Sequence, residues 1–530
     1  MTISADPTDV DTYVAAGWWE ATLTISELVA THARDRPDHV AYRWGAASLT
    51  WRDYHDLADA IAATVAAATS PGDRVLVWLP DGGAVHAAYL GCERAGAVTM
   101  GIGWRAGRRE LTHLVERTGA IVAIVPPDTA HGPGPEVAAS LGLDVIVIDD
   151  LDGSPTVAGG HTGPIDQVAT QGIGPSELWL LNSTSGTTGL PKCVMQTQNR
   201  WFYFHQLAVG AGALGDDEVW MSVVPAPFGF GLWTAHVTPT LLGSPCIVQS
   251  RFDAEAAVTA IEEHGVTVLC AVSSQFVMVL DAAEGRDISS LQTVFTGGEA
   301  ISPSRAAELE TQAGCRVLNF YGSNETGVLS GTTVDDPPER RYTTGGRVVA
   351  EMAVRLYDPD TGERLADHGE GQPACRGPAL ALGYWDDDDA NAALATDDGW
   401  FLMGDLVRIE PEGWLTVVGR TSDIVIRGGK NISAVAVEEE VATHPSVALV
   451  AVVGAPHPRL GETAVAYVKL RPGQSLTLDG LKDHLRDRGV TIDWWPEAVV
   501  VMDELPMSSG GKVAKSELRA LAAKGVDAQP

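Results

Sequence analysis

Hydrophobic positions fall into two alternating kinds of segment over the first 330 residues. Short apolar runs rich in β-branched residues predict strands, and Ala-rich segments with an apolar face predict amphipathic helices. Repeated strand–helix alternation favours an α/β fold with mostly parallel sheets covered by helices. The predicted strands are 74–79, 120–126, 145–149, 178–183, 219–225, 266–272, 293–296 and 317–321. The predicted helices are 52–68, 84–95, 107–117, 254–264 and 303–313.

The pattern changes along the rest of the chain. Segment 151–176 is rich in Gly, Pro, Ser and Thr and predicts a surface connection. Short apolar runs with Gly turns predict a small β subdomain over about 340–418. After Gly419 the sequence predicts a compact α/β unit with strands near 447–454 and 463–470 and a helix near 478–488. The chain is therefore expected to hold a large α/β part and a small one.

Composition limits the classes of molecule that we expect the protein to bind. The chain has 530 residues, enough for several domains, and a net charge of −33 spread along its length. Such a surface repels nucleic acid and anionic membranes, so neither is expected as a partner. The N-terminus lacks the features of a signal peptide, and no apolar run has the length of a membrane span, so we expect a cytoplasmic protein.

The cysteines support the same compartment. Six cysteines lie far apart, and none has metal-ligand spacing. We expect them to be buried thiols of a reducing cytoplasm: Cys92, Cys193, Cys246, Cys270, Cys315 and Cys375.

The most informative segment is the loop Ser183-Thr184-Ser185-Gly186-Thr187-Thr188-Gly189-Leu190-Pro191-Lys192, which follows the apolar run 178–181. Glycines let backbone N–H groups approach phosphates, hydroxyls donate hydrogen bonds, and the lysine offsets charge. The glycine spacing differs from a Walker A loop. A solvated Ser/Thr/Gly turn is the alternative. We expect this loop to hold ATP.

Four further segments carry candidate chemistry. Segments 296–300 and 319–327 each follow a predicted strand, so they belong to one sheet edge where nucleotides bind. Here Tyr321 could stack on a base and Glu325 could ligate Mg²⁺. Asp405, after a glycine, suits two ribose hydroxyls, and segment 506–512 delivers Lys512. Taken singly, Tyr321 could be core, Asp405 a turn cap and Lys512 a solvated lysine.

Together, these motifs in this order resemble the adenylate-forming superfamily of acyl-CoA synthetases, luciferases and peptide-synthetase adenylation domains. The resemblance covers nearly the whole chain. It implies an N-terminal adenylation core over 1–418, a hinge over 419–423 and a mobile lid over 424–530. It also implies that a carboxylic acid and ATP form an acyl-adenylate and pyrophosphate, after which the thiol of coenzyme A displaces AMP.

The resemblance assigns roles residue by residue. The phosphate loop comprises Thr184, Ser185, Gly186, Thr187, Thr188, Gly189 and Lys192. Gly298, Glu299 and Ala300 line the adenine, Tyr321 stacks on it, Gly322 belongs to the same nucleotide-binding segment, and Asn324 stands at the position that borders the α-phosphate. Asp405 and Arg420 hold the ribose, and Gly429 lies beside the pantetheine tunnel. Thr187, Lys192, Glu325 (as Mg²⁺ ligand) and Lys512 are the catalytic set, and Lys512 bridges the carboxylate and α-phosphate.

The acid pocket is expected, by family position, among 201–205, 228–233, 273–277 and 296–298. Its candidate residues are His205, Phe228, Gly229, Phe230, Trp233, Ser274 and Gly297. This mixture of aromatic and small residues favours a bulky apolar acid, whether aromatic, alicyclic or medium-chain. Segment 225–233 holds no Asp or Glu for an α-ammonium group, so amino-acid activation is disfavoured.

Three positions depart from the family pattern. Cys193 replaces a glycine, Asn324 stands where a threonine commonly touches the α-phosphate, and Ser422 occupies the hinge position usually held by Asp or Lys. The hinge change bears on transfer to coenzyme A, because the lid must rotate for that step. One alternative is an enzyme that hands its acyl-adenylate to a separate thiolating partner. A more remote alternative is an inactive nucleotide-binding regulator, and the sequence leaves a homodimer open.

Overall fold

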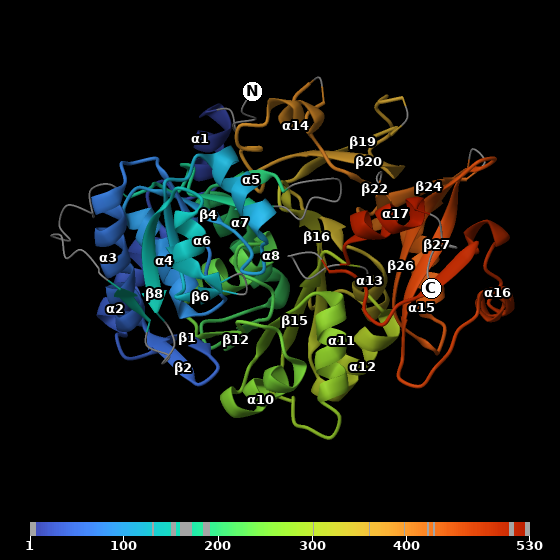
Figure 1. The fold of residues 1–530 in the computed structure, drawn as a ribbon, viewed down its shortest axis with the longest axis horizontal. Coiled ribbons are helices and arrows are strands. Elements are labelled where there is room, and N and C mark those ends of the chain that lie inside the picture. The colour runs from blue at the N-terminus through green and yellow to red at the C-terminus, as the bar shows by residue number, and fades with distance from the viewer. Residues whose placement is uncertain are drawn as a thin grey trace. The chain divides into compact units, whose positions relative to one another are not determined.

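The computed structural model describes residues 7–129, 132–149, 155–158, 172–183, 191–299, 301–359, 361–396, 398–420, 423–427, 430–507 and 513–524. These residues form two compact units (Figure 1). The first takes the described residues up to Ser183, then 191–353 and 375–401; the second takes 354–374 and those from 402 onward. The division reflects which residues pack together within each unit and does not test the hinge. The hinge at 419–423 therefore stays a prediction.

A nine-stranded sheet forms one half of the first unit, in the order β18-β17-β16-β15-β14-β12-β13-β1-β2. The six strands from β16 to β1 pair in parallel with one another, and β17 and β2 pair with the two ends of this group in antiparallel fashion. Every residue of β12, β14 and β15 is buried, as expected for parallel strands covered on both faces. The strands are β1 (Val40–Trp44), β2 (Ala47–Thr50), β12 (Trp220–Ser222), β13 (Cys246–Val248), β14 (Val268–Cys270), β15 (Thr293–Gly297), β16 (Arg316–Ser323), β17 (Gly327–Gly331) and β18 (Arg347–Val348).

A seven-stranded sheet forms the other half, in the order β11-β10-β4-β3-β5-β8-β9. Its strands from β10 to β8 pair in parallel, and β11 and β9 close the edges in antiparallel pairs. The bounds are β3 (Arg74–Val77), β4 (Val98–Gly101), β5 (Val122–Val125), β8 (Asp144–Asp149), β9 (Thr156–Ala158), β10 (Leu180–Ser183) and β11 (Cys193–Gln196). The short strands β6 (Asp128–Thr129) and β7 (Gly132–Pro133) form a separate pair.

Helices cover both sheets, and α4 (Gly83–Arg94) lies between them. It packs against β1 of one sheet and against β3 and β4 of the other, which explains why all of its residues are buried. The other helices of this unit are α1 (Pro7–Ala15), α2 (Ile25–Asp35), α3 (Trp51–Ala68), α5 (Arg108–Thr118), α6 (Gly134–Ala139), α7 (Gln198–Gly212), α8 (Gly229–Gly231), η2 (Leu232–Val237, a π-helix), α9 (Thr238–Leu242), α10 (Ala254–His264), α11 (Ser273–Ala282), α12 (Pro303–Ala313), α13 (Pro338–Thr343) and α14 (Asp388–Ala393).

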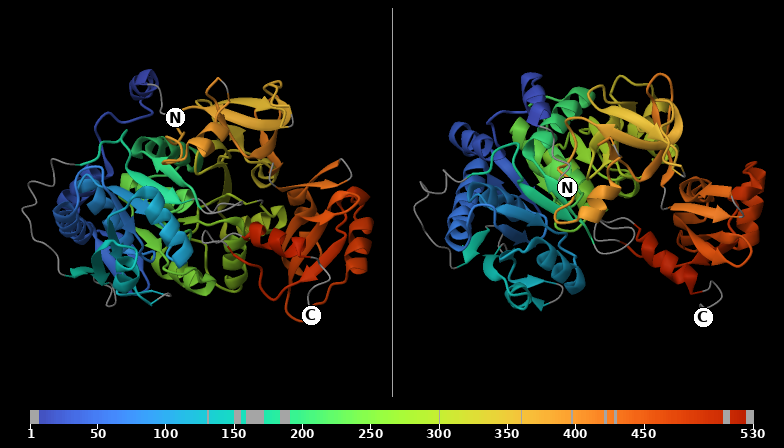
Figure 2. Two further views of the ribbon diagram at one scale, coloured as in Figure 1. Left: turned by 45° about the horizontal axis from the view of Figure 1, so that its top comes forward. Right: turned by 90° about the horizontal axis from the view of Figure 1, so that it is seen from above.

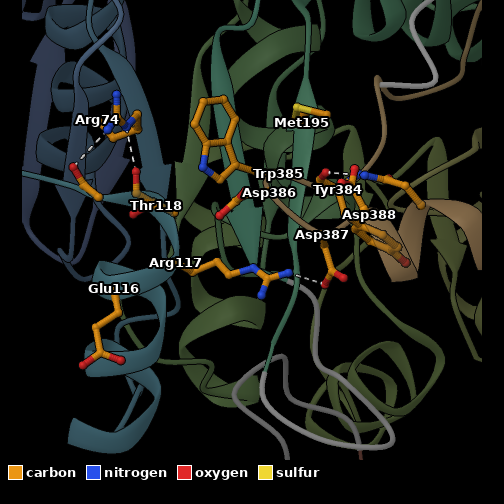
Figure 3. A pocket seen from close by; sticks show the side chains of 12 residues that line it. Arg74, Glu116, Arg117, Thr118, Met195, Tyr384, Trp385, Asp386, Asp387 and Asp388 are labelled. Atoms are coloured by element: carbon orange, nitrogen blue, oxygen red, sulfur yellow. Dashed lines mark hydrogen bonds and ion pairs between the residues drawn. The ribbon is translucent and has the colours of Figure 1, made fainter. Parts of the chain in front are cut away.

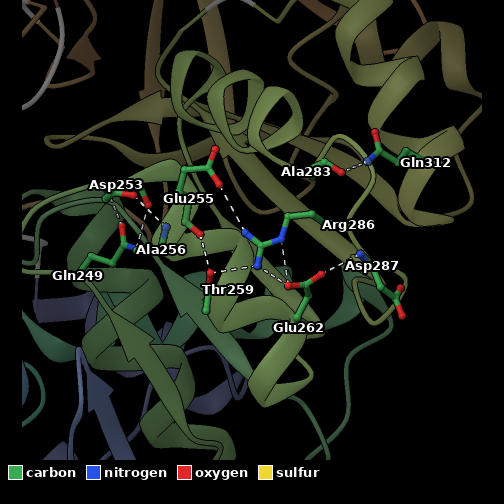
Figure 4. Close-up of polar contacts among 10 residues, drawn as sticks. All are labelled: Gln249, Asp253, Glu255, Ala256, Thr259, Glu262, Ala283, Arg286, Asp287 and Gln312. Carbon is green, nitrogen blue, oxygen red and sulfur yellow. Dashed lines mark hydrogen bonds and ion pairs between the residues drawn. The ribbon is translucent and has the colours of Figure 1, made fainter.

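Polar side chains mark where α10 begins and what holds it (Figure 4). The Asp253 carboxylate accepts from the Ala256 N–H at 2.9 Å, which satisfies a free donor of the first turn. Arg286, after α11, donates to Glu262 and to the Thr259 hydroxyl of α10. This ion pair, at 28% and 30% side-chain exposure, ties two surface segments together.

The second unit holds two smaller sheets, and its elements after residue 424 are orange to red in Figure 2. The first comprises β19 (Ala353–Tyr357), β20 (Gly369–Arg376), β22 (Asp405–Ile409) and β23 (Leu415–Arg420), with β21 (Phe401–Leu402) beside β20. The second comprises β24 (Ile424–Arg427), β25 (Lys430–Ser433), β26 (Val447–His457), β27 (Gly461–Leu470) and β28 (Ala498–Val501). Helices α15 (Ala434–Ala442), α16 (Leu478–Asp487) and α17 (Lys515–Ala523) pack on it, with the 3₁₀ turn η4 (Ile492–Trp494).

These elements confirm the predicted α/β class with mostly parallel sheets. Each strand and helix predicted from hydrophobic pattern is present, with boundaries shifted by a few residues. All six cysteines are buried free thiols, as predicted. Among the described residues, no helix combines the length and apolar character needed to cross a bilayer.

Candidate functional site

The ends of four parallel strands bring most of those predicted site residues that the structure describes to one edge of the nine-stranded sheet. Segment 228–233 follows β12, Ser274 follows β14, Gly298 and Glu299 follow β15, and 324–325 follows β16. Neighbouring strands of this group are parallel, so their carboxyl ends lie side by side. Strand order therefore assembles segments that are far apart in the sequence.

The turn after β15 joins two predicted subsites. Glu299, predicted to line the adenine, accepts at Oε2 from the N–H of Ser274, predicted for the acid pocket, at 3.0 Å. Gly297 lies so close to β16 that a Cβ there would be 2.4 Å from the Phe320 carbonyl oxygen. Gly298 has φ +74°, a conformation that favours glycine. Tyr321 lies on β16 and is partly exposed at this edge.

The side chain of Asn324 is held by the buried polar side chains of Asn182 and Gln196. The Asn324 side-chain oxygen accepts from Asn182 Nδ2 at 2.9 Å, and Asn182 in turn accepts from Gln196 at 2.8 Å. With its oxygen engaged, the Asn324 side chain keeps an NH₂ group that can donate to a phosphate oxygen. The predicted departure at Asn324 thus preserves a donor.

Arg200, on α7, binds the backbone of the same loop. Its guanidinium donates to the Asn324 carbonyl at 2.8 Å and to the Ala379 carbonyl at 2.8 Å. Burial lowers the pKa of Arg200 to about 9, and the nearby Glu325 carboxylate opposes this fall. The guanidinium therefore stays charged at neutral pH beside Glu325.

Tyr384 lies between two predicted catalytic residues. Its hydroxyl donates to Glu325 Oε1 at 2.8 Å, and its ring lies 4.7 Å from Lys192 Nζ. Burial, together with Glu325, raises the pKa of Tyr384, so the phenol keeps its proton. Lys192 directly precedes β11, whose first residue, Cys193, is buried.

The acid side of the site is an aromatic cluster. Trp233, which is 1% exposed, lies between Phe204 at 4.4 Å and Phe230 at 5.5 Å between ring centroids. Phe295 and Phe320 meet the Trp233 ring edge-on. Offset and edge-on contacts of this kind fix ring positions, so this wall is rigid and apolar.

Gly229 joins this aromatic side to the phosphate side. A Cβ at Gly229 would lie 2.5 Å from Asn324 Oδ1 and 3.1 Å from the Trp201 ring. The backbone of the predicted acid loop therefore touches the residue predicted to border the α-phosphate. Phe228, beside it, caps α8 and is partly buried.

His205 brings a neutral imidazole to the predicted acid pocket. Burial lowers its pKa to about 4, so it carries no charge near neutral pH. Its Nδ1 is buried and has no hydrogen-bond partner among the described residues. It can therefore hydrogen-bond a ligand but does not attract a carboxylate by charge.

Asp81, which sequence reasoning missed, anchors the acid loop. It follows β3 of the seven-stranded sheet, and its Oδ1 accepts from the Ala226 N–H at 2.7 Å. Pro225 and Pro227 have no N–H, so Ala226 provides the sole backbone donor of this three-residue run. Burial raises the pKa of Asp81 to about 7, and the Ala226 N–H opposes this rise.

The second unit carries the two residues predicted for the ribose. Asp405 and Arg420 are directly paired across the antiparallel strands β22 and β23. Asp405 is 8% exposed. Their joint action on the ribose stays a prediction.

Several predicted residues lie outside the described residues. They are Thr184, Ser185, Gly186, Thr187, Thr188, Gly189, Ala300, Ser422, Gly429 and Lys512. The side chain of Arg420 also falls outside them. Their assignments stay predictions; Ser183 and Lys192, which flank the predicted phosphate loop in the sequence, are described.

The donor set fits magnesium carried by a nucleotide. Glu325 offers one carboxylate, and no group of three or more His, Cys, Asp or Glu side chains gathers around a metal-sized space in the described ranges. Mg²⁺ commonly takes one or two protein carboxylates together with substrate phosphates and water. Glu325 would hold the ion, which would neutralise charge on the phosphates.

A cavity of about 490 Å³ opens beside Tyr384 (Figure 3). Arg117 and Asp387 form an ion pair at 2.6 Å across it, and the Arg74 guanidinium lies 5.7 Å from the Trp385 ring. Arg74 donates to the Thr118 and Gly119 carbonyls and so caps α5. Both cations already have protein partners here, and the cavity lining is of mixed charge.

Comparison with known proteins assigns the chain to a family. The model of the AMP-binding enzymes matches residues 29–385, and that of the AMP-binding enzyme C-terminal domain matches 436–512. The chain belongs to the AMP-binding enzymes.

Relatives and solved structures agree with this family. A 2-hydroxy-7-methoxy-5-methyl-1-naphthoate–CoA ligase of Streptomyces carzinostaticus is 30% identical, over 97% of this chain and 95% of the relative. A salicyl-AMP ligase / salicyl-S-ArCP synthetase of Mycobacterium tuberculosis is 32% identical, over 95% of this chain and 91% of the relative. An anthranilate CoA ligase bound to anthranoyl-AMP has the same fold, with a TM-score of 0.83, 20% identity and coverage of 97% and 99%.

The AMP-binding enzyme thus contains site residues of two origins. Glu299, Asn324 and Glu325 follow motifs that the sequence displays. Arg200, Tyr384 and Asp81 do not, and reach the site only through the packing of α7, segment 379–385 and the end of β3. The sequence signal that could have drawn attention to Tyr384 is the Gly-Tyr-Trp run at 383–385.

Proposed function

We propose that this AMP-binding enzyme activates an apolar carboxylic acid with ATP and Mg²⁺ and transfers the acyl group to coenzyme A. The contact that carries the proposal is that between Gly229 and Asn324. It supports the proposal because a carboxylate in the predicted acid loop would then lie near the residue predicted to border the α-phosphate, where a carboxylate oxygen would attack phosphorus. The new anhydride bond forms as pyrophosphate leaves.

The chemistry fits the charges available. A carboxylate is a poor electrophile, and conversion to a mixed anhydride with AMP supplies a good leaving group. Two anions must be brought together, so catalysis depends on orientation and on neutralising negative charge. Lys192, the Mg²⁺ held by Glu325, and Lys512 are proposed to supply that charge. No general base is needed for this half-reaction.

A flat or alicyclic ring acid is the substrate class that the pocket favours. Trp201, Phe204, Phe230 and Trp233 make an apolar wall, and His205 is neutral. Such a wall favours burial of apolar area over binding of a second charge. The naphthoate–CoA ligase and the salicyl-AMP ligase among the relatives support a ring acid.

A panel assay tests the proposal. Purified enzyme would be incubated with ATP, Mg²⁺, coenzyme A and ring, medium-chain and short acids, and AMP and acyl-CoA would be measured. We expect acyl-CoA with at least one ring acid and weak turnover of acetate. AMP release that never depends on coenzyme A would overturn the ligase assignment.

A second candidate is adenylation followed by transfer to a carrier-protein thiol. The salicyl-S-ArCP synthetase among the relatives, together with Ser422 at the predicted hinge, favours it. Acid-dependent exchange of labelled pyrophosphate into ATP, with no acyl-CoA formed, would support this alternative. Cytoplasmic localisation stays a proposal drawn from the sequence.

A further inference from the structure

We propose that Tyr384 is a positioning residue that sets the Glu325 carboxylate for Mg²⁺ and provides an aromatic surface for Lys192. The inference rests on the adenylation half of the proposed function and goes beyond it by assigning work to a residue outside the motif set. Tyr384 touches both predicted catalytic residues, with its hydroxyl 2.8 Å from Glu325 Oε1 and its ring 4.7 Å from Lys192 Nζ.

The backbone of Tyr384 is fixed on both sides. Its N–H donates to Asn391 Oδ1 at 2.7 Å, and its carbonyl accepts from Asn391 Nδ2 at 2.8 Å. The residue also forms an antiparallel bridge with Val194 of β11. Tyr384 is 6% exposed. A side chain held this way has little freedom, so its hydroxyl fixes the carboxylate that it touches.

The same segment ties the two catalytic loops together through backbone contacts. The Ala381 N–H donates to the Glu325 carbonyl at 2.8 Å, and the Trp385 N–H donates to the Cys193 carbonyl at 2.8 Å. Segment 381–385 therefore joins the loop after β16 to the exit of the phosphate loop. Tyr384 lies at the centre of that connection and also forms a wall of the cavity in Figure 3.

The hydroxyl can direct the metal ligand. A carboxylate accepts several hydrogen bonds, and donation by Tyr384 occupies Oε1. The other oxygen, Oε2, would then be available to hold a cation. The neutral phenol also leaves the negative charge on Glu325 intact, which Mg²⁺ binding needs.

The ring has a separate effect on Lys192. An ammonium group over an aromatic face is attracted by the ring quadrupole, which holds the side chain in place without neutralising its charge. The hydroxyl and the ring thus predict different losses when removed.

The Tyr384→Phe variant tests the hydroxyl by ATP binding, measured calorimetrically without acid or coenzyme A. In Mg²⁺ we expect the Kd for ATP to rise about tenfold, as for loss of a hydrogen bond to a charged group. With EDTA in place of Mg²⁺ we expect less than about a twofold change, because the hydroxyl acts through Glu325 and the metal. Glu325→Gln should show the same loss, and Tyr384→Phe should add little to it.

Tyr54→Phe is the control. Tyr54, on α3, is also buried, and its hydroxyl donates to the His86 carbonyl at 3.3 Å, in segments that hold no predicted site residue. It should leave both Kd values unchanged. Tyr384→Leu, with thermal unfolding as a folding check, should weaken ATP binding in EDTA as well, because the surface for Lys192 is lost.

The outcomes separate the two proposals. Equal Kd values for Tyr384→Phe and wild type in Mg²⁺, or equal weakening with and without Mg²⁺, would overturn the role of Tyr384 alone. A wild-type enzyme that binds no ATP would overturn the proposed function and this inference with it. Because acid and coenzyme A are absent, a failed thioester assay has no bearing on Tyr384.

Discussion

At the scale of single residues, the site depends on partly or fully buried groups that sequence motifs do not reveal. Asp81 holds the Ala226 N–H, Arg200 holds the Asn324 carbonyl, and Tyr384 holds Glu325. Each binds the backbone or side chain of a predicted site residue from behind. Residues predicted to touch substrate are therefore positioned by residues that the motifs do not include.

Asp81 gives a pH-dependence that can be measured. Its pKa in the folded protein is about 7, whereas an unfolded aspartate titrates near 4. The folded state holds the extra proton in this window, so the contribution of Asp81 to the free energy of unfolding falls as pH rises from about 4 to about 7. Asp81→Asn keeps an accepting oxygen and cannot ionise.

We therefore expect Asp81→Asn to gain stability relative to wild type as the pH is raised. Urea unfolding of both proteins from about pH 5 to about pH 8 measures the difference. A difference that stays constant across this range would contradict a titrating Asp81. Asp81→Leu, which loses the acceptor, should raise the KM for the acid.

Gly229 gives a prediction based on space. Gly229→Ala places a Cβ 2.5 Å from Asn324 Oδ1, so one of the two loops must move. We expect kcat/KM for adenylation to fall by about tenfold or more, since small misplacements of reacting groups are costly. Gly210→Ala on α7, where a Cβ meets nothing within 4 Å, is the control and should be neutral or slightly stabilising. Equal kinetics for both variants would count against the Gly229 contact.

At the scale of elements, hydrophobic pattern predicted the framework and missed α7. Strands such as β14 and β15 are short, fully buried and β-branched, so their composition identifies them. Helix α7 instead buries seven successive residues, 198–204, including the polar Gln198, Asn199 and Arg200. It has no polar face there for periodicity to detect.

The contacts of α7 explain why its sequence did not predict a helix. Gln198 accepts from the Ile25 N–H and Asn199 accepts from the Glu20 N–H, so these amides serve as backbone partners for the N-terminal segment. Pairings between residues more than a hundred positions apart cannot be derived from local propensity. Nor can it give the contact of Tyr384 with Glu325, 59 positions apart, whereas the predictions for the phosphate loop and Glu325 rest on local motifs.

Helix α10 offers a prediction at this scale. Asp253→Ala removes the side chain that caps its first turn (Figure 4), and we expect a loss of about 1 kcal/mol in the free energy of unfolding. Asp253→Asn keeps an accepting oxygen and should restore most of it. Urea unfolding of the three proteins gives the comparison. No loss in the alanine variant would show that the cap contributes nothing.

At the scale of the whole molecule, two compact units share the predicted chemistry. The first carries Lys192, Asn324 and Glu325, and the second carries the Asp405–Arg420 pair. Within the second unit, Asp423 at the end of the predicted hinge pairs with Lys515 at 3.3 Å and with Arg519, both on α17. Lys515 also pairs with Glu438 at 2.8 Å. These ion pairs connect the hinge region to the helix that follows the Lys512 segment.

The division into two units predicts that a substitution can impair adenylation without impairing transfer to coenzyme A. Lys512→Ala should lower adenylation about a hundredfold or more, because a charge is lost where two anions meet. Transfer from a chemically prepared acyl-AMP to coenzyme A should be largely retained, since no phosphoryl transfer remains. Pyrophosphate release and thioester formation are measured in parallel. An equal fall in both would contradict the role assigned to Lys512.

The burial of all six cysteines has a practical consequence for studying these two units. Burial raises the pKa of every one of these thiols, so little thiolate is available to react with a maleimide. A cysteine introduced on the exposed surface of each unit could then carry a fluorophore or spin label without removal of the native ones. The distance between two such labels would report, in solution, whether ATP, an acyl-adenylate or coenzyme A changes the arrangement of the units.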